Sequence, residues 1–247
     1  FEYDMELSAR GPLVLHGQRG YSVKSTDGSA SHYYSQPFYE ISGMLTLPQG
    51  EVPVKGQAWL DREWSSSPLE ASQTGWDWFS LSFESGEKLM AFQLRDRKSL
   101  HFNSATWIAA DGTATAYESG ALLAKPVRRR LVAGRKIPTV WALQLPDREL
   151  DIQLTAINHN AWMDVSVPYW EGPIRVEGSH LVSQHRRLTC LSVDVFRALF
   201  PQPWVTVGES PPPVVHLDRR FKALYSRADR SLCCVHSPEH ARDEDYP

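Results

Sequence analysis

The chain of 247 residues is 42% hydrophobic and 22% charged, as is usual for soluble globular proteins, and it is long enough for one large or two modest domains. Its net charge of −3 argues against a nucleic-acid-binding protein, since such proteins usually carry a basic surplus. The sequence contains no run of about 18 apolar residues and therefore predicts no membrane-spanning helix.

The first ten residues, FEYDMELSAR, resemble the end of a strand rather than a signal peptide. Phe1, Tyr3 and Met5 alternate with acidic residues, which is the period of a half-buried strand. The chain also does not begin with Met. We therefore expect that it starts inside a domain and that upstream sequence completes this domain.

Between residues 38 and 178 the dominant hydrophobic period is two. Alternating segments are paired around turn-forming residues at Gln49-Gly50, Glu84-Ser85-Gly86-Glu87, Asp111-Gly112 and Pro146-Asp147-Arg148. Strands at this spacing predict antiparallel hairpins and an all-β barrel or sandwich, with no long helix.

The composition changes after His180. The alternation is lost, Arg outnumbers Lys, Pro211-Pro212-Pro213 interrupts the segment, and the end is polar and acidic. These features predict an irregular, poorly ordered tail over residues 181–247.

Motifs of the common catalytic and cofactor sites are absent. The sequence has no P-loop, no dinucleotide-binding glycine motif, no HExxH motif and no nucleophile elbow. The histidines share no metal-ligand spacing, and the cysteines Cys190, Cys233 and Cys234 all lie near the C-terminus. We expect neither a metal ion nor a cofactor.

The segment GQAWLDREW (56–64) places three consecutive charges between two tryptophans in an expected strand. Residues i and i+2 of a strand share a face, so Trp59 and Asp61 lie on the same side. If that side lines an apolar cavity, burial raises the pKa of Asp61 and makes it a proton donor near neutral pH. The alternative is structural, with Asp61 paired to an arginine such as Arg62 of an adjacent strand or capping a turn.

Further aromatic residues are candidates for a hydrophobic binding site, because large rings often line ligand cavities. They occur in or beside the segments AWLDREW, GWDWF (75–79) and PYWEGP (168–173). Core packing is the alternative for each of them. The candidates are Trp64, Trp76, Trp78, Tyr169 and Trp170.

Six segments together resemble the lipocalin-like AttH / hydroxyneurosporene synthase family, whose best-known members are bacterial carotenoid 1,2-hydratases. They follow the family's order over roughly residues 10–180. The segments are GQRGYSVKS (17–25), ASHYYSQP (30–37), VKGQAWLDREW (54–64), GWDWFSLSFESGEKLMAFQLRD (75–96), PTVWALQLP (138–146) and PYWEGPIRVEGSH (168–180).

The resemblance implies two lipocalin-like antiparallel β-barrel domains. Residues 1–72 would be the C-terminal part of the first barrel, truncated at its N-terminus, and residues 73–180 would form the second domain. The family continues after EGSH with a Gly-rich strand ending in Thr-Gly-Tyr, whereas this chain continues with LVSQHRRLTC. We therefore expect a shifted reading frame or an altered terminus, which leaves closure of the second barrel open.

The resemblance also implies a catalytic group made of His32, Tyr34, Trp59 and Asp61, which match the family's positions. Asp61 would protonate a terminal C=C bond of an isoprenoid, and the rings of Trp59 and Tyr34 would stabilise the resulting cation. His32 would keep Asp61 protonated or take a proton from the attacking water. The protein would then be a hydro-lyase that needs no cofactor.

Two other functions remain open. A non-catalytic member would carry or sense a lipid-like molecule in the cell envelope, in peripheral contact with the membrane or with an ABC transporter. An isomerase or pericyclic enzyme would use the barrels to hold one conformer of its substrate. Each function implies a hydrophobic small-molecule ligand. The resemblance favours the bacterial periplasm as the compartment, with the cytoplasmic side of the membrane as the alternative.

Overall fold

The computed structural model describes residues 2–65, 70, 72–97, 101–165, 168–180, 183–184, 188–194, 222–226 and 231–236. Within these ranges the regular structure is β, apart from the short 3₁₀ helix η1 (Pro146–Arg148). The described part of the chain contains no helix that is both long and apolar enough to span a membrane. The expected all-β class is therefore confirmed.

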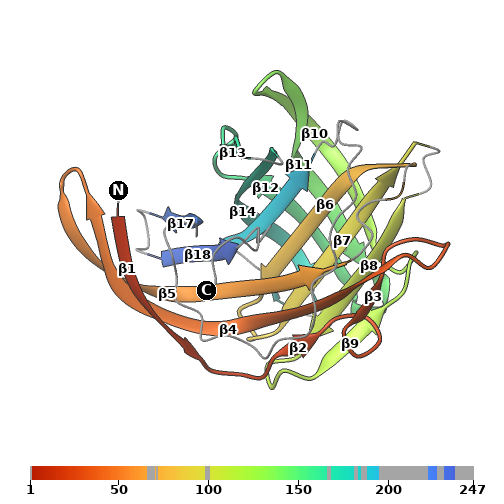
Figure 1. Cartoon of the computed structure of the whole chain (residues 1–247), viewed down its shortest axis with the longest axis horizontal. Helices are drawn as coiled ribbons and strands as arrows, with labels where there is room; N and C mark the ends of the chain where they lie inside the picture. Colours follow the sequence, from red (N-terminus) through yellow and green to blue (C-terminus); the bar gives the residue numbers. More distant parts are fainter. Residues whose placement is uncertain are drawn as a thin grey trace, which may run out of the picture.

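The first sheet has five antiparallel strands, in which the long central strand pairs with all four others. Figure 1 shows its two longest strands sweeping beneath the second sheet and continuing beyond it. The strands are β1 (Glu2–Ala9), β2 (Val14–Leu15), β3 (Tyr21–Val23), the central β4 (Ala30–Leu47) and β5 (Gly50–Trp64).

The second sheet has the strand order β10-β11-β12-β14-β16-β6-β7-β8-β9, with two short strands paired to β14. Its strands are β6 (Gln73–Ser82), β7 (Lys88–Asp96), β8 (Phe102–Ile108), β9 (Ala114–Tyr117), β10 (Leu123–Val132), β11 (Arg135–Leu145), β12 (Leu150–Ala156), β13 (Trp162–Met163), β14 (Tyr169–His180), β15 (Ser183–Gln184) and β16 (Leu188–Asp194). A separate pair consists of β17 (Lys222–Ser226) and β18 (Ser231–His236).

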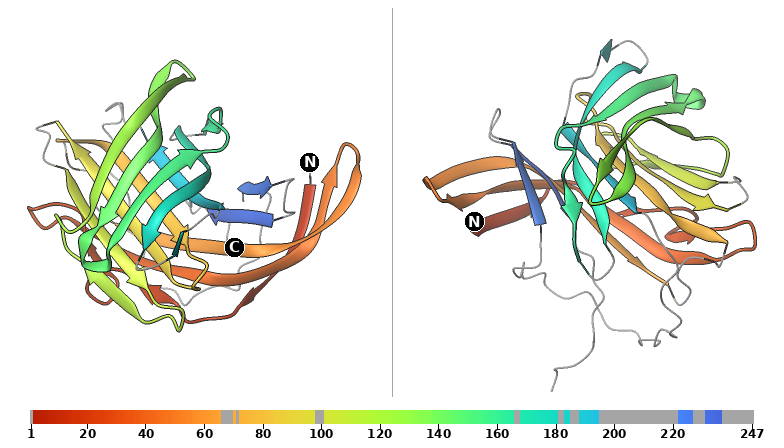
Figure 2. Two further views of the ribbon diagram at one scale, coloured as in Figure 1. Left: turned by 180° about the vertical axis from the view of Figure 1, so that it is seen from behind. Right: turned by 90° about the horizontal axis from the view of Figure 1, so that it is seen from above.

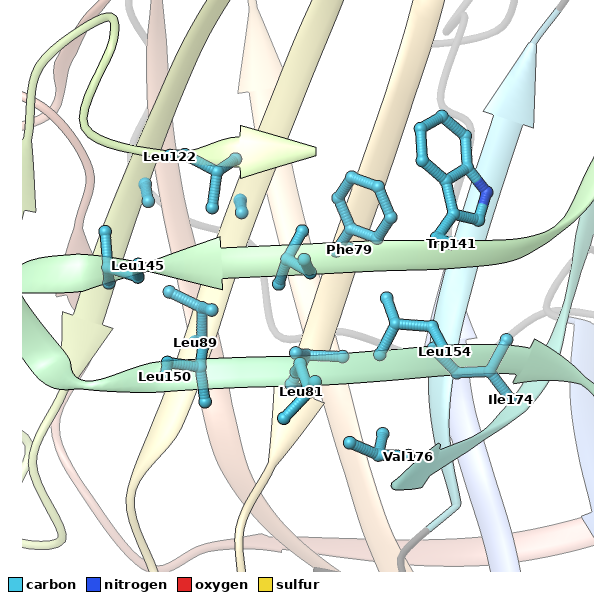
Figure 3. Packing of buried hydrophobic residues seen from close by; sticks show 14 of the residues in the cluster. Phe79, Leu81, Leu89, Leu122, Trp141, Leu145, Leu150, Leu154, Ile174 and Val176 are labelled. Carbon is cyan, nitrogen blue, oxygen red and sulfur yellow. The ribbon is translucent and has the colours of Figure 1, made fainter. Parts of the chain in front are cut away.

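The second sheet curls around a single hydrophobic core. Phe79 on β6 meets Trp141 on β11 edge to face, with ring centroids 5.3 Å apart, although three strands separate β6 from β11 in the sheet. Leucines from β6, β7, β11 and β12 fill the space beside this contact (Figure 3). Side chains from distant strands meet in this way only when a sheet closes on itself, as in a barrel.

The hairpins expected from the turn residues are all present as β4–β5, β6–β7, β8–β9 and β11–β12. The second sheet also extends past residue 180, because β16 pairs with β14 on one side and with β6 on the other. Most of the expected irregular tail, including residues 195–221 and 237–247, lies outside the described residues.

A β-bulge divides the β4–β5 hairpin into an outer and an inner half. Two residues of β4, Pro37 and Phe38, stand opposite the single residue Trp59 of β5. Proline has no N–H group to donate across the sheet, and the N–H of Phe38 donates to the side chain of Gln36 at 3.1 Å. The bulge shifts the pairing by one residue. The set of β4 side chains that would otherwise share a face with Asp61 and Trp59 of β5 therefore lies on the opposite face in the inner half.

The inner half of the first sheet packs against the outside of the second. Val14, Tyr33 and Trp59 from the first sheet form one buried cluster with residues that include Met90 and Phe92 of β7. This cluster is separate from the interior core of the second sheet. Polar side chains buried in this layer are consequently held between two sheets.

Candidate active site

Asp61 lies in the layer between the two sheets. It is only 5% exposed, and it projects from the same face of β5 as the buried Trp59. This shared face agrees with the alternation of the sequence. The carboxyl group is therefore removed from water beside an indole ring.

Two neutral hydroxyl groups of β4 donate hydrogen bonds to the same oxygen of Asp61. Ser35 lies directly opposite Asp61 in the register, and its hydroxyl donates to Oδ1. The hydroxyl of Tyr33, two residues earlier on the same face, donates to Oδ1 at 3.0 Å. A carboxylic acid accepts best on its carbonyl oxygen, so this arrangement favours Oδ2 as the oxygen that carries a proton.

His16 extends the network behind Ser35. Its Nε2 lies 2.6 Å from Ser35 Oγ, and its Nδ1 lies 3.0 Å from Thr106 Oγ1 on β8. Because Ser35 gives its only hydroxyl proton to Asp61, it accepts from His16 Nε2–H. Nδ1 of the neutral ring then accepts from the Thr106 hydroxyl. In the series Thr106–His16–Ser35–Asp61, each group thus donates its hydrogen bond towards Asp61.

The protonation states of His16 and Tyr33 agree with this direction of donation. Burial, helped by the nearby Lys24 cation, lowers the pKa of His16 from 6.5 to about 3. The imidazole is therefore neutral at physiological pH. Burial also raises the pKa of Tyr33 well above its usual value. The phenol consequently remains a hydrogen-bond donor.

Indole groups complete the surroundings of Asp61. Trp78 of β6 donates from Nε1 to the Tyr33 hydroxyl at 2.9 Å, which fixes the direction of the phenolic hydrogen bond. The indole Nε1 of Trp59 is buried and has no hydrogen-bond partner among the described residues. A buried donor without a partner costs about 1–3 kcal/mol, and an oxygen atom of a ligand beside Asp61 would satisfy it.

An ion pair borders the cluster. Lys24 Nζ lies 2.6 Å from Glu63 Oε1 and also lies over the rings of Phe92 and Tyr33, at 3.8 and 4.9 Å from their centroids. Glu63 shares the Asp61 face of β5, so the charged and the neutral parts of the network are neighbours on one strand.

The structure does not bring the four expected catalytic residues together. Trp59 and Asp61 face the layer between the sheets, whereas His32 and Tyr34 lie on the opposite face of β4. There the ring of His32 stacks on Trp64, with centroids 5.5 Å apart, and Trp64 is 53% exposed. His32 and Tyr34 therefore do not contact Asp61 in this arrangement.

The β-bulge at Pro37 explains this separation. Continuing the register of the outer hairpin would pair Gln36 with Asp61 and would place His32 and Tyr34 on the Asp61 face. The one-residue shift pairs Ser35 with Asp61 instead, so the opposite set of β4 side chains meets the carboxyl group.

The other expected ligand-binding aromatics are divided between the two cores. Trp76 and Trp78 pack in or against the layer that holds Asp61. Trp170 is fully buried inside the second sheet, where its Nε1 donates to the His159 carbonyl at 2.9 Å. Tyr169 is buried on the other face of β14. Trp170 therefore belongs to the packed interior.

Sequence patterns missed four residues of the network, namely His16, Tyr33, Ser35 and Thr106. Tyr33 and Ser35 are in the SHYYS segment that we singled out, but alternation alone does not tell which face is buried. His16 and Thr106 are 90 residues apart and meet only through tertiary packing. No local signal could have joined them.

A second aspartate is buried inside the second sheet. Asp77 is in contact with the Arg95 guanidinium, and Gln93 Nε2 donates to it at 3.3 Å. Burial raises the pKa of Asp77 from 3.8 to about 6, although Arg95 opposes the shift. Within the described ranges, no group of three or more His, Cys, Asp and Glu side chains is placed to hold a metal ion.

Comparisons with known proteins agree on a family. A family model described as AttH-like matches residues 1–188. The crystal structure of an AttH protein from Nitrosomonas europaea is 29% identical, with a TM-score of 0.69 over 77% of this chain and 60% of that chain. Kievitone hydratase from Nectria haematococca is 18% identical, with a TM-score of 0.67 over 78% of this chain and 61% of that chain.

The identity and the coverage of these matches determine what each similarity shows. At 18% identity, the likeness to kievitone hydratase establishes the fold alone. The chain spans about three fifths of the length of each solved structure. None of the curated proteins matches it significantly.

Proposed function

The chain belongs to the AttH-like family, and from this premise we propose that it binds a hydrophobic, isoprenoid-like ligand and adds water to one of its C=C bonds. Asp61 is the proposed acid. The observation that carries the proposal is the set of hydrogen bonds that ends on Asp61 Oδ1 beside the indoles of Trp59 and Trp78. That kievitone hydratase has the same fold is compatible with this chemistry, but the reaction is argued from Asp61.

The reaction needs only an acid and a water molecule. Asp61 Oδ2–H transfers its proton to the less substituted alkene carbon, so a C–H bond forms as the π bond breaks. The resulting tertiary carbocation takes up water through a new C–O bond. The added water then returns a proton to the Asp61 carboxylate, which restores the acid.

Neighbouring groups have separate parts in this proposal. The ring faces of Trp59 and Trp78 would stabilise the cation, an effect worth up to about 2 kcal/mol in a desolvated site. The buried N–H of Trp59 would donate to the oxygen of the attacking water or of the product. His16, acting through Ser35, would be a positioning residue that holds the carboxyl group in place.

The protonation of Asp61 is decided by two opposing effects. Burial among rings favours the neutral acid, whereas hydrogen bonds donated by Tyr33 and Ser35 favour the carboxylate. The proposal requires that burial prevails. The hydrogen bonds from Tyr33 and Ser35 come from neutral hydroxyls, and the Lys24 cation is paired with Glu63.

The test is a product assay with an acyclic carotenoid and, separately, geraniol as substrates. Mass spectrometry should detect a product that has gained one water with the wild-type chain. Asp61→Asn should lower the rate by roughly 10²–10⁴-fold, the usual contribution of general acid catalysis. Asp151→Asn, on an exposed position of β12, is the matched control and should retain the wild-type rate.

Two results would change the assignment. Full activity in Asp61→Asn would move the acid to another residue. Saturable binding of the isoprenoid without a hydrated product would instead support the carrier function, in which Asp61 orients a ligand head group. A carrier of this kind could work in the cell envelope beside a transporter, and its ligand would be identified from lipid that co-purifies with the chain.

A further inference from the structure

The hairpin formed by β10 and β11 differs in charge from the rest of the chain. Residues 123–136, LAKPVRRRLVAGRK, contain six Lys and Arg residues and no acidic residue, while the whole chain has a net charge of −3. The remainder of the chain is correspondingly acidic. The six cations are Lys125, Arg128, Arg129, Arg130, Arg135 and Lys136.

These cations are exposed and are not neutralised by the described residues. All six side chains are accessible to solvent, and none forms an ion pair with the part of the chain that the structure describes. Arg135 lies over the ring of Trp162, with its guanidinium carbon 4.7 Å from the centroid, and this contact leaves its charge intact. Most of this positive charge is therefore available to a partner.

The same hairpin exposes large aliphatic side chains. Leu131 is 74% exposed, more than any other large hydrophobic residue described, and Val127 and Leu123 are 57% and 50% exposed. Leu131 lies beside the two-residue turn Ala133-Gly134, whose positive φ angles of 47° and 74° are those of a tight hairpin turn. The apolar residue is thus near the tip and is flanked by cations.

The hairpin also projects from the molecule. In Figure 1 and in the left view of Figure 2 its green ribbon rises beyond the other strands of the second sheet. A flat surface approaching from this side would meet the tip before the acidic remainder of the chain. This arrangement allows one face to touch a negatively charged surface without like-charge repulsion from the rest of the molecule.

We propose that the β10–β11 hairpin docks the protein on an anionic lipid surface, with Leu131 entering the headgroup region and the cations contacting lipid phosphates. Cations near such a surface each strengthen binding about fivefold, and exposed aliphatic residues add burial in the acyl boundary. A soluble polyanion would use the cations but would leave Leu131 exposed to water. The combination therefore favours lipid, and the proposal does not depend on the reaction assigned to Asp61.

The experiment measures sedimentation of the whole chain with vesicles of phosphatidylcholine, with or without phosphatidylglycerol. Binding should require phosphatidylglycerol and should weaken as salt is added. The triple variant Arg128→Gln, Arg130→Gln and Lys136→Gln should lower the partition coefficient about 100-fold, from about fivefold per cation. Arg129 is left unchanged because its charge acts on buried Asp77.

Two further variants separate lipid binding from simple charge attraction. Leu131→Ser keeps the charge and should weaken vesicle binding roughly tenfold, the effect of exposing an aliphatic side chain that is otherwise buried. The matched control Arg10→Gln, Lys55→Gln and Arg175→Gln removes three exposed cations elsewhere and should bind nearly as the wild type does. Circular dichroism would verify that each variant is folded.

Three outcomes would overturn the proposal. The first is absence of binding to either vesicle, or equal binding to both. The second is an equal loss in the hairpin variant and in the control, since location would then be irrelevant. The third is tight binding to soluble heparin together with vesicle binding that Leu131→Ser does not change, which would indicate an acidic partner rather than a lipid surface.

Discussion

The two aspartates that are buried in the described part of the chain have different partners. Asp61, between the sheets, accepts hydrogen bonds from the neutral hydroxyls of Tyr33 and Ser35. Asp77, inside the second sheet, contacts the Arg95 guanidinium. A guanidinium stabilises a carboxylate far more than a hydroxyl does, because its charge attracts the anion at short range. Residue type and burial alone therefore do not identify an acid.

This contrast assigns different roles to the two residues. The Asp77–Arg95 pair links strands β6 and β7, so the charges of Asp77 and Arg95 have a structural role. Asp61 is the proposed proton donor. Changes to each set of partners should therefore affect different properties of the protein.

The largest effect on stability is expected from removal of Arg95. Arg95→Met would leave the fully buried Asp77 without its cation, and breaking a buried pair in this way typically costs about 3–5 kcal/mol. The partly exposed position of Arg95 favours the lower end of this range. Urea unfolding at pH 7 would measure the loss, with the exposed Arg175→Met as control.

The pH dependence of this loss is a further test. At pH 5 Asp77 can be protonated and no longer needs a cation, so the loss should be smaller there than at pH 7. A loss no greater than that of the Arg175 control at pH 7 would show that the Asp77–Arg95 pair is not structural.

His16 and Asp77 should have opposite effects on the pH dependence of folding. The pKa of His16 is about 3 in the folded chain and 6.5 ordinarily, so the unfolded state binds more protons between these values. The free energy of unfolding then rises with pH by about 1.4 kcal/mol per unit. For Asp77 the folded pKa of about 6 exceeds the ordinary 3.8, and its contribution falls with the same slope between them.

Two variants separate these contributions. His16→Gln should remove the rising contribution, so the difference from wild type grows as pH increases from 3 towards 6.5. Asp77→Asn should remove the falling contribution between pH 4 and 6, so the difference changes in the opposite direction. Urea unfolding at several pH values measures both slopes. Parallel curves for wild type and His16→Gln would mean that His16 is not buried as a neutral ring.

A smaller effect is expected from the link between His16 and Asp61. Ser35→Ala removes one hydrogen bond to each of these groups and should cost about 1–2 kcal/mol of stability. Ser42→Ala, at an exposed position of the same strand, should change stability by less than about 0.5 kcal/mol. If Ser35 positions the acid, its loss should also shift the pH–rate profile of hydration, whereas a purely structural serine would leave that profile in place.

Much of the fold could be predicted because its determinants are local. Asp111-Gly112 and Pro146-Asp147-Arg148 mark turns, and the alternation of FSLSF marks a strand regardless of its partners. The shared face of Trp59 and Asp61 follows from the same local rule. These features require no knowledge of pairing between strands.

The rest of the candidate site depends on non-local geometry. The bulge at Pro37 decides whether Ser35 or Gln36 pairs with Asp61. A register shift of one residue moves every side chain of the strand to the opposite face of the sheet. Proline in the sequence marks a place where a bulge can form, but it does not fix the register. His16 reaches the network only because β2 pairs with β4 in the folded chain.

The protonation of Asp61 at pH 7 is the most direct test of the central claim. Infrared difference spectra between wild type and Asp61→Asn would reveal the C=O stretch of a neutral carboxylic acid. We predict that this band is present at pH 7 in wild type and in Asp77→Asn, since Asp77 with a pKa of about 6 is mostly ionised there. A carboxylate signal from Asp61 in place of the acid band would contradict acid catalysis by this residue.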